Sequence, residues 1–242
     1  SCNRTVIKLF TQLGGRFTVA TGRPPESIRA ALGDIQLSLP AISCNGSLLY
    51  DFSTDTVLRR ATLDRKQATL AIQDVVRQFP RIGVEVMAHA GEMFVVQANE
   101  YTHAHQVDEK ITGVTCPLDS VPDGWVKVVF ASDPETIRKL SQYAKTRYYG
   151  RENYFLATNS IYYEIMPAGV GKASALRDLC ALLGVPVENT VVIGDYYNDL
   201  EIMQAAGYSV AVSNAPPEVK AAADEVTNCT CSDGAVGEYL YK

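Results

Sequence analysis

The sequence has few of the residues that build disulfide scaffolds and histidine-rich metal sites. Its 242 residues include six cysteines, three histidines and one tryptophan. The cysteines are too sparse for a disulfide framework in a chain of this length, so we expect reduced thiols. Cys229 and Cys231 form a C-x-C pair with no second pair and no neighbouring histidine, which argues against zinc. His103 and His105 fall in a polar stretch, and we interpret them as surface-loop residues rather than metal ligands.

The chain also lacks long hydrophobic runs and an excess of positive charge. No run reaches the roughly eighteen apolar residues that a membrane-spanning helix needs. The formal net charge is −5, so no broad positive field favours nucleic acid or an anionic membrane as a partner. With no basic and apolar leader in the sequence, we expect a cytoplasmic protein. Nothing in the sequence indicates its oligomeric state.

Strand and helix patterns alternate at both ends of the chain. The composition, 47% hydrophobic and 20% charged, is that of an ordinary globular protein with an apolar core. A helix is expected from Asn3 and a second one through Ile28 and Leu32, and further predicted helices cover residues 172–183, 198–205, 216–223 and 234–241. Strands are predicted at 16–21, 40–44, 190–194 and 208–212, and the apolar run 190–194 is typical of a strand buried on both faces. Repeated strand–helix units indicate a parallel sheet with right-handed crossovers.

Between about residues 55 and 166 the pattern changes to half-exposed strands with intervening helices. Alternating segments at 84–87, 93–96, 125–130 and 162–165, with helical patterns at 64–79 and 134–144, indicate an antiparallel sheet. We therefore predict an α/β fold with a doubly wound, Rossmann-like parallel-sheet core from residues 1–54 and 167–242. An α+β cap domain, residues 55–166, is inserted into it. The aromatic residues Tyr148, Tyr149, Tyr154 and Phe155 are assigned to the cap core, with a ligand surface as the alternative.

Candidate phosphate-binding residues lie at the ends of the first two predicted strands, where ligands bind in such sheets. Thr21 and Gly22 offer a hydroxyl and backbone amides to phosphate oxygens, and Arg23 is near enough to assist. The alternative is a polar strand end followed by an ordinary turn. Asn45 and Gly46 follow the next strand on the same side, where a plain hairpin turn is the alternative.

Two further motifs carry charge. Lys172 opens a helix after a glycine turn, where its ammonium suits phosphate or a carboxylate; the alternative is a solvent-facing lysine. Asp195, Asn198 and Asp199 gather two carboxylates and an amide oxygen on one loop, which favours Mg²⁺ over the alternative of an Asx turn or helix N-cap. Because all these motifs fall on one rim of the predicted sheet, together they indicate a phosphate-plus-magnesium site.

Four segments, in this order, resemble motifs of the Cof-type subfamily of haloacid dehalogenase-like hydrolases, the HAD superfamily. Residues 19–24 (VATGRP) resemble the second family motif, and residues 42–46 (ISCNG) resemble the segment before the large cap. Residues 164–172 (EIMPAGVGK) resemble the return into the lysine motif, and residues 194–199 (GDYYND) resemble the acidic fourth motif. The resemblance covers essentially the whole chain. It implies a phosphatase that hydrolyses a small phosphorylated metabolite, such as a sugar phosphate, through an aspartyl-phosphate intermediate.

The resemblance also implies roles for particular residues. Lys172 and Thr21 would take part in catalysis, and Asp195 and Asp199 would form the site for a Mg²⁺ cofactor. Phosphate and substrate would be bound by Thr21, Gly22, Arg23, Asn45, Gly46, Lys172 and Asn198.

One family motif is missing from this sequence. The first motif, Asp-x-Asp-Gly-Thr, is absent, and Asp34 and Asp51 follow the second motif and cannot replace it. We expect the nucleophilic aspartate and the acid–base aspartate to lie upstream of residue 1. The alternatives are a phosphomutase, or a phosphometabolite-binding protein without turnover if the first motif is truly absent.

Overall fold

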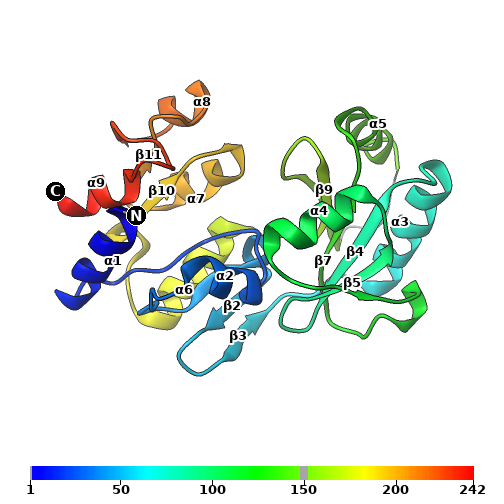
Figure 1. Ribbon diagram of the computed structural model, residues 1–242, viewed down its shortest axis with the longest axis horizontal. Coiled ribbons are helices and arrows are strands. Elements are labelled where there is room, and N and C mark those ends of the chain that lie inside the picture. Colours follow the sequence, from blue (N-terminus) through cyan, green and yellow to red (C-terminus); the bar gives the residue numbers. More distant parts are fainter. Residues whose placement is uncertain (1, 148–151) are drawn as a thin grey trace. The chain divides into compact units, whose positions relative to one another are not determined.

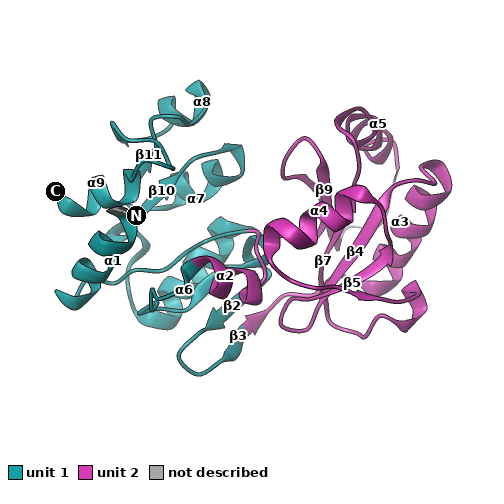
Figure 2. Cartoon of the chain, in the orientation of Figure 1, with its two compact units in different colours: residues 1–21, 32–58, 171–242 teal, residues 22–31, 59–170 magenta. Residues whose placement is uncertain are grey.

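The computed structural model describes residues 2–147 and 152–242, which form two compact units (Figure 1, Figure 2). Unit 1 contains residues 1–21, 32–58 and 171–242, and unit 2 contains residues 22–31 and 59–170. Within the described ranges, no helix is both long and apolar enough to cross a membrane.

Unit 1 contains two small sheets surrounded by helices. A parallel sheet has the order β10-β11-β12, and a second sheet has the order β1-β2-β3, with β1 and β2 antiparallel. The strands are β1 (Ala41–Ser43), β2 (Leu48–Asp51), β3 (Thr56–Arg60), β10 (Val191–Gly194), β11 (Tyr208–Ala211) and β12 (Glu225–Val226). The helices are α1 (Cys2–Gln12), α6 (Lys172–Leu183), α7 (Leu200–Ala205), α8 (Pro217–Ala221) and α9 (Ala235–Tyr241), with short 3₁₀ turns η1 (Cys44–Gly46), η3 (Val187–Asn189) and η4 (Tyr197–Asp199).

Helix α6 has the bounds expected from its sequence. The Ser174 hydroxyl accepts a hydrogen bond from the Gly171 amide at 3.0 Å, which satisfies a donor at the helix start. Gly184 ends the helix in a left-handed conformation with a φ of 63°, as a glycine C-cap does. Its apolar face packs on β1, β2 and α7 through a core cluster of Ile42, Leu49, Ala173, Ala175, Leu176, Leu179, Cys180 and Ile202.

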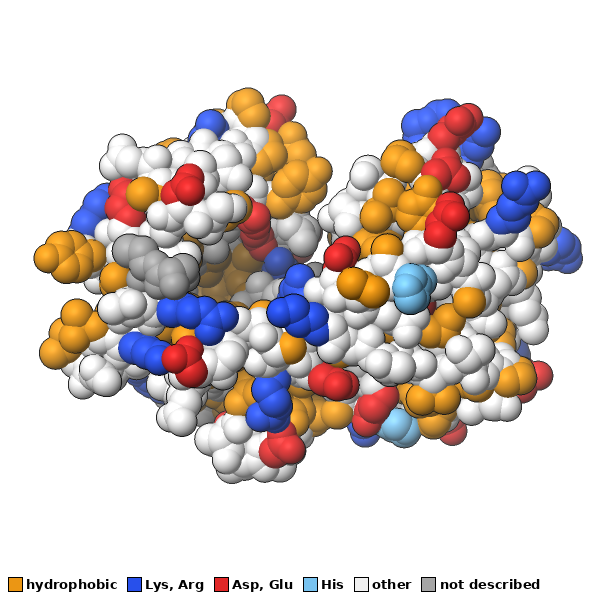
Figure 3. Space-filling view, viewed as in Figure 1, with side chains coloured by type: hydrophobic (Ala, Val, Ile, Leu, Met, Phe, Trp, Pro, Cys, Tyr) orange, Lys and Arg blue, Asp and Glu red, His pale blue; other side chains and the backbone are white. Residues whose placement is uncertain are grey.

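Two strand predictions in unit 1 need correction. Residues 16–21 are not a regular strand: Ala20 alone forms an isolated parallel bridge, to Ile42. The run 190–194 was expected to be buried on both faces, but Val191 is 48% exposed. Both segments line a cavity of about 1040 Å³, visible as a hollow with hydrophobic side chains inside it in Figure 3. β10 is an edge strand of its sheet and segment 16–21 forms a bridge only at Ala20, so β10 is more exposed, and segment 16–21 less regular, than their sequences suggest.

Unit 2 is built on a six-stranded sheet with the order β6-β5-β4-β7-β9-β8. All described pairs are antiparallel except β5 with β6. The strands are β4 (Gly83–Ala88), β5 (Glu92–Gln97), β6 (Val114–Thr115), β7 (Trp125–Ala131), β8 (Asn153–Ala157) and β9 (Tyr162–Pro167). The helices are α2 (Pro25–Leu32), α3 (Arg65–Gln78), α4 (Glu100–Glu109) and α5 (Pro134–Ala144), with the 3₁₀ turn η2 (Leu118–Ser120).

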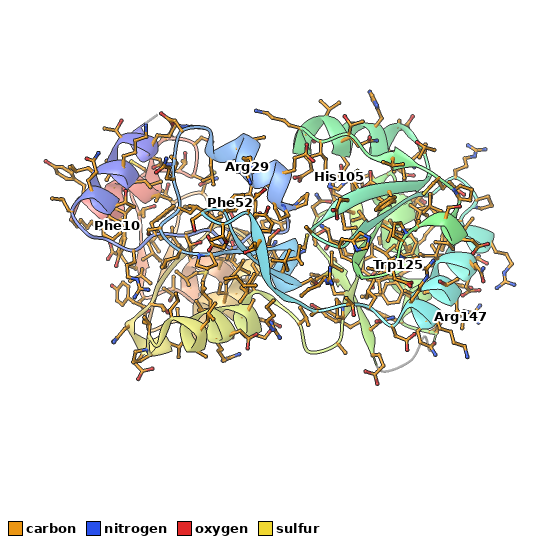
Figure 4. The ribbon with its side chains drawn as sticks, turned by 90° about the horizontal axis from the view of Figure 1, so that it is seen from below. Phe10, Arg29, Phe52, His105, Trp125 and Arg147 are labelled. Carbon is orange, nitrogen blue, oxygen red and sulfur yellow. The ribbon has the colours of Figure 1, made fainter. Side chains whose placement is uncertain are left out.

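The two faces of this sheet differ in polarity because side chains alternate along a strand. One face packs against α3 and α5 in a core that includes Trp125, Phe130 and Ile165. Trp125 is 1% exposed, and its indole N–H donates to the Pro122 carbonyl at 2.7 Å (Figure 4). The predicted aromatic cluster belongs partly to this core, since Phe155 stacks on Tyr163 with ring centroids 5.3 Å apart. Tyr154 donates to the Val170 carbonyl at 2.6 Å, and Tyr148 and Tyr149 lie outside the described residues.

The interpretation of the His-Ala-His stretch as a surface loop is wrong. It forms α4, whose N-terminus is closed by reciprocal hydrogen bonds between Asn99 and Thr102. His103 is exposed, but His105 is buried, and its Nδ1 lies 2.5 Å from Glu85 Oε2 (Figure 4). The buried face of α4 is itself polar, so the segment lacks the apolar periodicity by which a helix is recognised.

Glu238 on α9 holds a neighbouring loop of unit 1. Its carboxylate accepts hydrogen bonds from the backbone amides of Asn228 and Cys229 at 3.0 and 2.7 Å. These hydrogen bonds lower the pKa of Glu238 from 4.5 to about 2, and the bond from the Asn228 amide has the largest effect. A carboxylate that is bonded in this way stabilises the fold only while it is ionised.

Glu238→Gln should therefore lower the free energy of unfolding at neutral pH. The difference from the wild-type protein should disappear in acid. Because the folded-state pKa lies below the unfolded value, the contribution is fully present above the unfolded value of 4.5 and is lost as the pH falls towards about 2. Urea unfolding of the wild-type and variant proteins across this range would measure the difference in the free energy of unfolding. A difference that grows on acidification would contradict the prediction.

Candidate active site

A buried ion pair joins the lysine motif to the acidic motif within unit 1. The Lys172 ammonium, at the first position of α6, lies 2.6 Å from Asp199 Oδ1 at the end of η4. The two side chains are 8% and 12% exposed, which excludes the solvent-facing alternative for Lys172. Since removing two charges from water is costly, the pair persists only where geometry and further hydrogen bonds compensate.

Asp199 also contacts the backbone of Asp195, which directly follows β10. Its Oδ2 accepts a hydrogen bond from the Asp195 amide at 3.1 Å, and its side chain makes no cap hydrogen bond to α7. The pKa of Asp195 is raised, first by desolvation and then by the charge and hydrogen bonding of Asp199, while Lys172 acts in the opposite direction. Asp195 itself remains solvent-accessible at the end of the strand. Two carboxylates thus lie close together with one of them open to solvent.

This donor set fits Mg²⁺. Hard carboxylate oxygens are its preferred ligands, and it takes one or two of them and completes its shell with water and substrate phosphate. Across residues 2–147 and 152–242, no group of three or more His, Cys, Asp or Glu side chains is placed to hold a metal. The described residues therefore do not indicate a metal site whose ligands all come from protein side chains. A cation beside Asp195 and Asp199 would also relieve the repulsion that raises the pKa of Asp195.

The segment 44–46 packs against the start of α6. The Asn45 amide donates to the Thr21 carbonyl at 3.0 Å, which ties the turn to the end of segment 16–21. Cys44, Asn45 and Gly46 have positive φ angles of 49°, 54° and 99°, a conformation that costs energy for the two residues with side chains. Asn45 and Gly46 form the hairpin between β1 and β2, and the turn is also a packing element of the site.

Contacts in unit 1 therefore link the sequence-predicted site residues from four separate segments. The chain of contacts runs through Thr21, Asn45, Gly46, Gly171, Lys172, Asp199 and Asp195. Asn198 is half-buried on η4, and Tyr196 and Tyr197, which precede it in the sequence, are exposed. The centroids of the two tyrosine rings lie 5.0 Å apart in an edge arrangement, and no sequence motif predicted a role for these side chains.

Gly22 and Arg23 belong to unit 2, where they contact residues that sequence reasoning missed. Arg23 Nη1 lies 3.1 Å from Glu109 Oε2 and donates to Ser27 Oγ at 2.8 Å. The Gly22 carbonyl accepts a hydrogen bond from Lys127 Nζ at 3.0 Å. The sequence carried one indication that Lys127 is unusual: it is a lysine inside the otherwise apolar strand at residues 125–131.

Gly46→Ala should be strongly destabilising because two penalties combine there. The residue has a φ of 99°, and an added Cβ would lie 2.3 Å from the Gly171 carbonyl oxygen. Gly184→Ala is the matched control, since its φ is also positive, at 63°, but nothing lies within 4 Å of an added Cβ. We expect Gly46→Ala to lower the free energy of unfolding by about 1–3 kcal/mol more than the control, the usual effect of overpacking. Equal losses in urea unfolding would show that the contact with Gly171 is easily relieved.

Comparison with known proteins identifies the family to which the chain belongs. Residues 1–240 match the family model described as haloacid dehalogenase-like hydrolase. Pyridoxal phosphate phosphatase YbhA from Escherichia coli (strain K12) is 26% identical over 245 residues, which cover 95% of this chain and 86% of that protein. The 5-amino-6-(5-phospho-D-ribitylamino)uracil phosphatase YwtE from Bacillus subtilis (strain 168) is 26% identical over 258 residues, covering 96% of this chain and 87% of that protein.

A solved structure extends the comparison to the fold. The crystal structure of a haloacid dehalogenase-like hydrolase from Bacteroides thetaiotaomicron matches 99% of this chain and 91% of its own chain, with a TM-score of 0.85 and 21% identity. The predicted α/β fold class and the predicted family resemblance are confirmed. The chain belongs to the family of haloacid dehalogenase-like hydrolases.

Proposed function

We propose that the protein is a magnesium-dependent phosphatase that hydrolyses a small phosphorylated metabolite. The observation that carries the proposal is the network of Lys172, Asp199 and Asp195 in unit 1, in which Lys172 and Asp199 form a buried ion pair next to the solvent-accessible Asp195. A fixed ammonium next to two carboxylates suits a phosphoryl group and a divalent cation at the same place. The two curated relatives, by their names, act on phosphorylated small molecules, which supports this substrate class.

In this proposal most of the rate enhancement comes from positioning and charge. Asp195 and Asp199 hold Mg²⁺, which when bound neutralises phosphate charge and polarises the phosphoryl oxygens. The Lys172 ammonium, held by Asp199, stabilises negative charge on the transferring group. Thr21 and Gly22 hold phosphoryl oxygens, while contacts with phosphate or substrate come from Arg23, Asn45, Gly46 and Asn198. The guanidinium of Arg23 shares its charge with Glu109, so we expect its contribution to be smaller.

We propose that the nucleophilic aspartate lies upstream of residue 1 and that its strand occupies the cavity of unit 1. The residues that line this cavity include 17–20 and residues 191–193 of β10. Segment 16–21 bridges β1 in parallel, and β10 pairs with β11 in parallel, so each has its other edge towards the cavity. One parallel strand between them would join the two small sheets and satisfy the backbone groups of both edges. Its carboxyl end would lie near Asp195.

We further propose that unit 1 is the hydrolase core and that unit 2 contains the substrate-selecting cap. The mostly antiparallel sheet of unit 2 belongs to the α+β segment that is inserted in sequence between the parts of unit 1. Residues 22–31 group with unit 2 through contacts such as that of Arg23 with Glu109, although they precede the insertion in sequence.

Phosphate release from a panel of phosphorylated metabolites tests the proposal. The full-length protein, with its N-terminus verified by mass, is assayed with Mg²⁺ and with a chelator in excess. The panel includes sugar phosphates, pyridoxal phosphate and phosphorylated ribityl compounds. Chelator-sensitive release supports the proposal. Absence of release from folded protein overturns it, and transfer that requires a bisphosphate activator would indicate a phosphomutase instead.

A further inference from the structure

A buried lysine in unit 2 contacts the backbone of the phosphate motif. Lys127 on β7 is 2% exposed, and Glu164 on the neighbouring strand β9 is 4% exposed. The Lys127 ammonium lies 3.0 Å from Glu164 Oε1 and also 3.0 Å from the Gly22 carbonyl oxygen, to which it donates a hydrogen bond. A charged pair this deeply buried is rare, because each ion loses its hydration.

The position of the ammonium fixes the orientation of one peptide group. In a trans peptide unit the carbonyl oxygen and the following amide N–H point in opposite directions. The cation at the Gly22 oxygen therefore directs the Arg23 N–H away from Lys127. It also polarises the peptide group, which makes that N–H a stronger donor to an anion.

The same loop is held from a second direction. The guanidinium of Arg23 contacts Glu109 and Ser27, and the Ser27 hydroxyl donates to Glu109 as well. Lys127 and Glu109 come from different elements of unit 2, β7 and α4. Anchoring by both of them limits rotation of the Gly22–Arg23 peptide group.

We propose that Lys127, held in place by Glu164, is a positioning residue for phosphate binding, which orients the Gly22–Arg23 peptide group so that its N–H faces the substrate phosphate. This inference rests on the proposed function and deepens it, since it assigns a role to a cap-sheet residue that does not itself touch the phosphate. Positioning of this kind can be worth about 100-fold in rate when it is lost.

A double variant tests this role without leaving an unpaired buried charge. Lys127→Met combined with Glu164→Met replaces the ion pair with apolar side chains, an exchange that buried pairs often tolerate. Lys139→Met combined with Glu135→Met is the matched control, because this pair on α5 has the same composition, a distance of 2.8 Å and exposed side chains. Lys127→Arg keeps a cationic donor for the Gly22 carbonyl.

Two readouts separate positioning from a merely structural role. Hydrogen–deuterium exchange, measured without substrate, should be faster at the Gly22 and Arg23 amides in the double variant, while the core strands of unit 2 keep their protection. The kcat/KM for phosphate release should fall by about 10- to 100-fold. The matched control should behave as wild type in both, and Lys127→Arg should retain most of the loop protection and activity.

The outcomes also distinguish this inference from the proposed function. A wild-type protein that releases phosphate, together with a folded double variant whose loop exchange and kcat/KM are unchanged, overturns the role of Lys127 alone. A wild-type protein that releases no phosphate from the panel overturns the proposed function, whatever the exchange experiment shows.

Discussion

Asp195→Ala should lower kcat/KM for phosphate release by about 100- to 1000-fold or more, the range expected when one electrostatic group of an active site is removed. Asp195 directly follows β10 with its side chain open to solvent, so Asp195→Ala removes a hard oxygen ligand without removing a buried side chain. The fold should therefore tolerate the change. Steady-state assays over a range of Mg²⁺ concentrations would measure the effect.

Two variants show whether the effect belongs to the metal site. Asp195→Asn keeps an oxygen ligand but loses the charge, so it should retain more activity than Asp195→Ala and require more Mg²⁺. Glu188→Gln removes an exposed carboxylate that precedes β10, at the opposite end from Asp195, and should leave activity unchanged. Full activity in Asp195→Ala would refute the assignment of this loop to Mg²⁺.

Lys172→Met should lower the free energy of unfolding by about 3–5 kcal/mol, the usual effect of breaking a buried ion pair from one side. The reason is that Asp199, which is 12% exposed, would keep a negative charge without its ammonium partner at 2.6 Å. Phosphate release should fall as well, because the same ammonium is proposed to stabilise the transferring group. Urea unfolding followed by far-UV circular dichroism would measure the stability.

A second substitution separates the two effects. Lys172→Met combined with Asp199→Asn removes both charges, so much of the lost stability should return while activity stays low. Lys8→Met is the control for an exposed pair: Lys8 and Asp34 are 42% and 67% exposed, and breaking such a pair should cost about 1 kcal/mol or less. If Lys172→Met lowered the free energy of unfolding no more than Lys8→Met, the result would contradict the assignment of Lys172 and Asp199 as a buried ion pair.

The parts of the site that could be predicted from the sequence are those with local signals. The glycine turn before Lys172 and the glycine after Leu183 mark the two ends of α6. Gly184 ends the helix in a left-handed conformation, with a φ of 63°, that its neighbours do not favour. The polar motifs of unit 1 were expected together because strand ends in an α/β sheet meet at one edge. Their contacts through Asn45 and Asp199 agree with this expectation.

The parts that could not be predicted depend on partners far away in the sequence. Lys127 contacts Gly22 over a separation of 105 residues, and His105 contacts Glu85 over 20 residues. Hydrophobic periodicity cannot predict such pairs, because in the sequence a buried polar residue cannot be told from a polar residue at the surface. Residues 16–21 fail in a different way: their composition favours a strand, but a regular strand also needs a run of hydrogen bonds to a neighbouring strand, and among the described residues this segment forms one bridge, from Ala20 to Ile42.

The single tryptophan makes the two units spectroscopically distinct. Trp125 is the one tryptophan of the 242-residue sequence, and it is buried in the core of unit 2 with Arg65 4.8 Å from its ring centre. Its fluorescence therefore reports the unfolding of unit 2, while circular dichroism reports the helices of both units. Coincident transitions from the two signals would mean that the units unfold as one cooperative body, and separate transitions would give each unit its own free energy of unfolding.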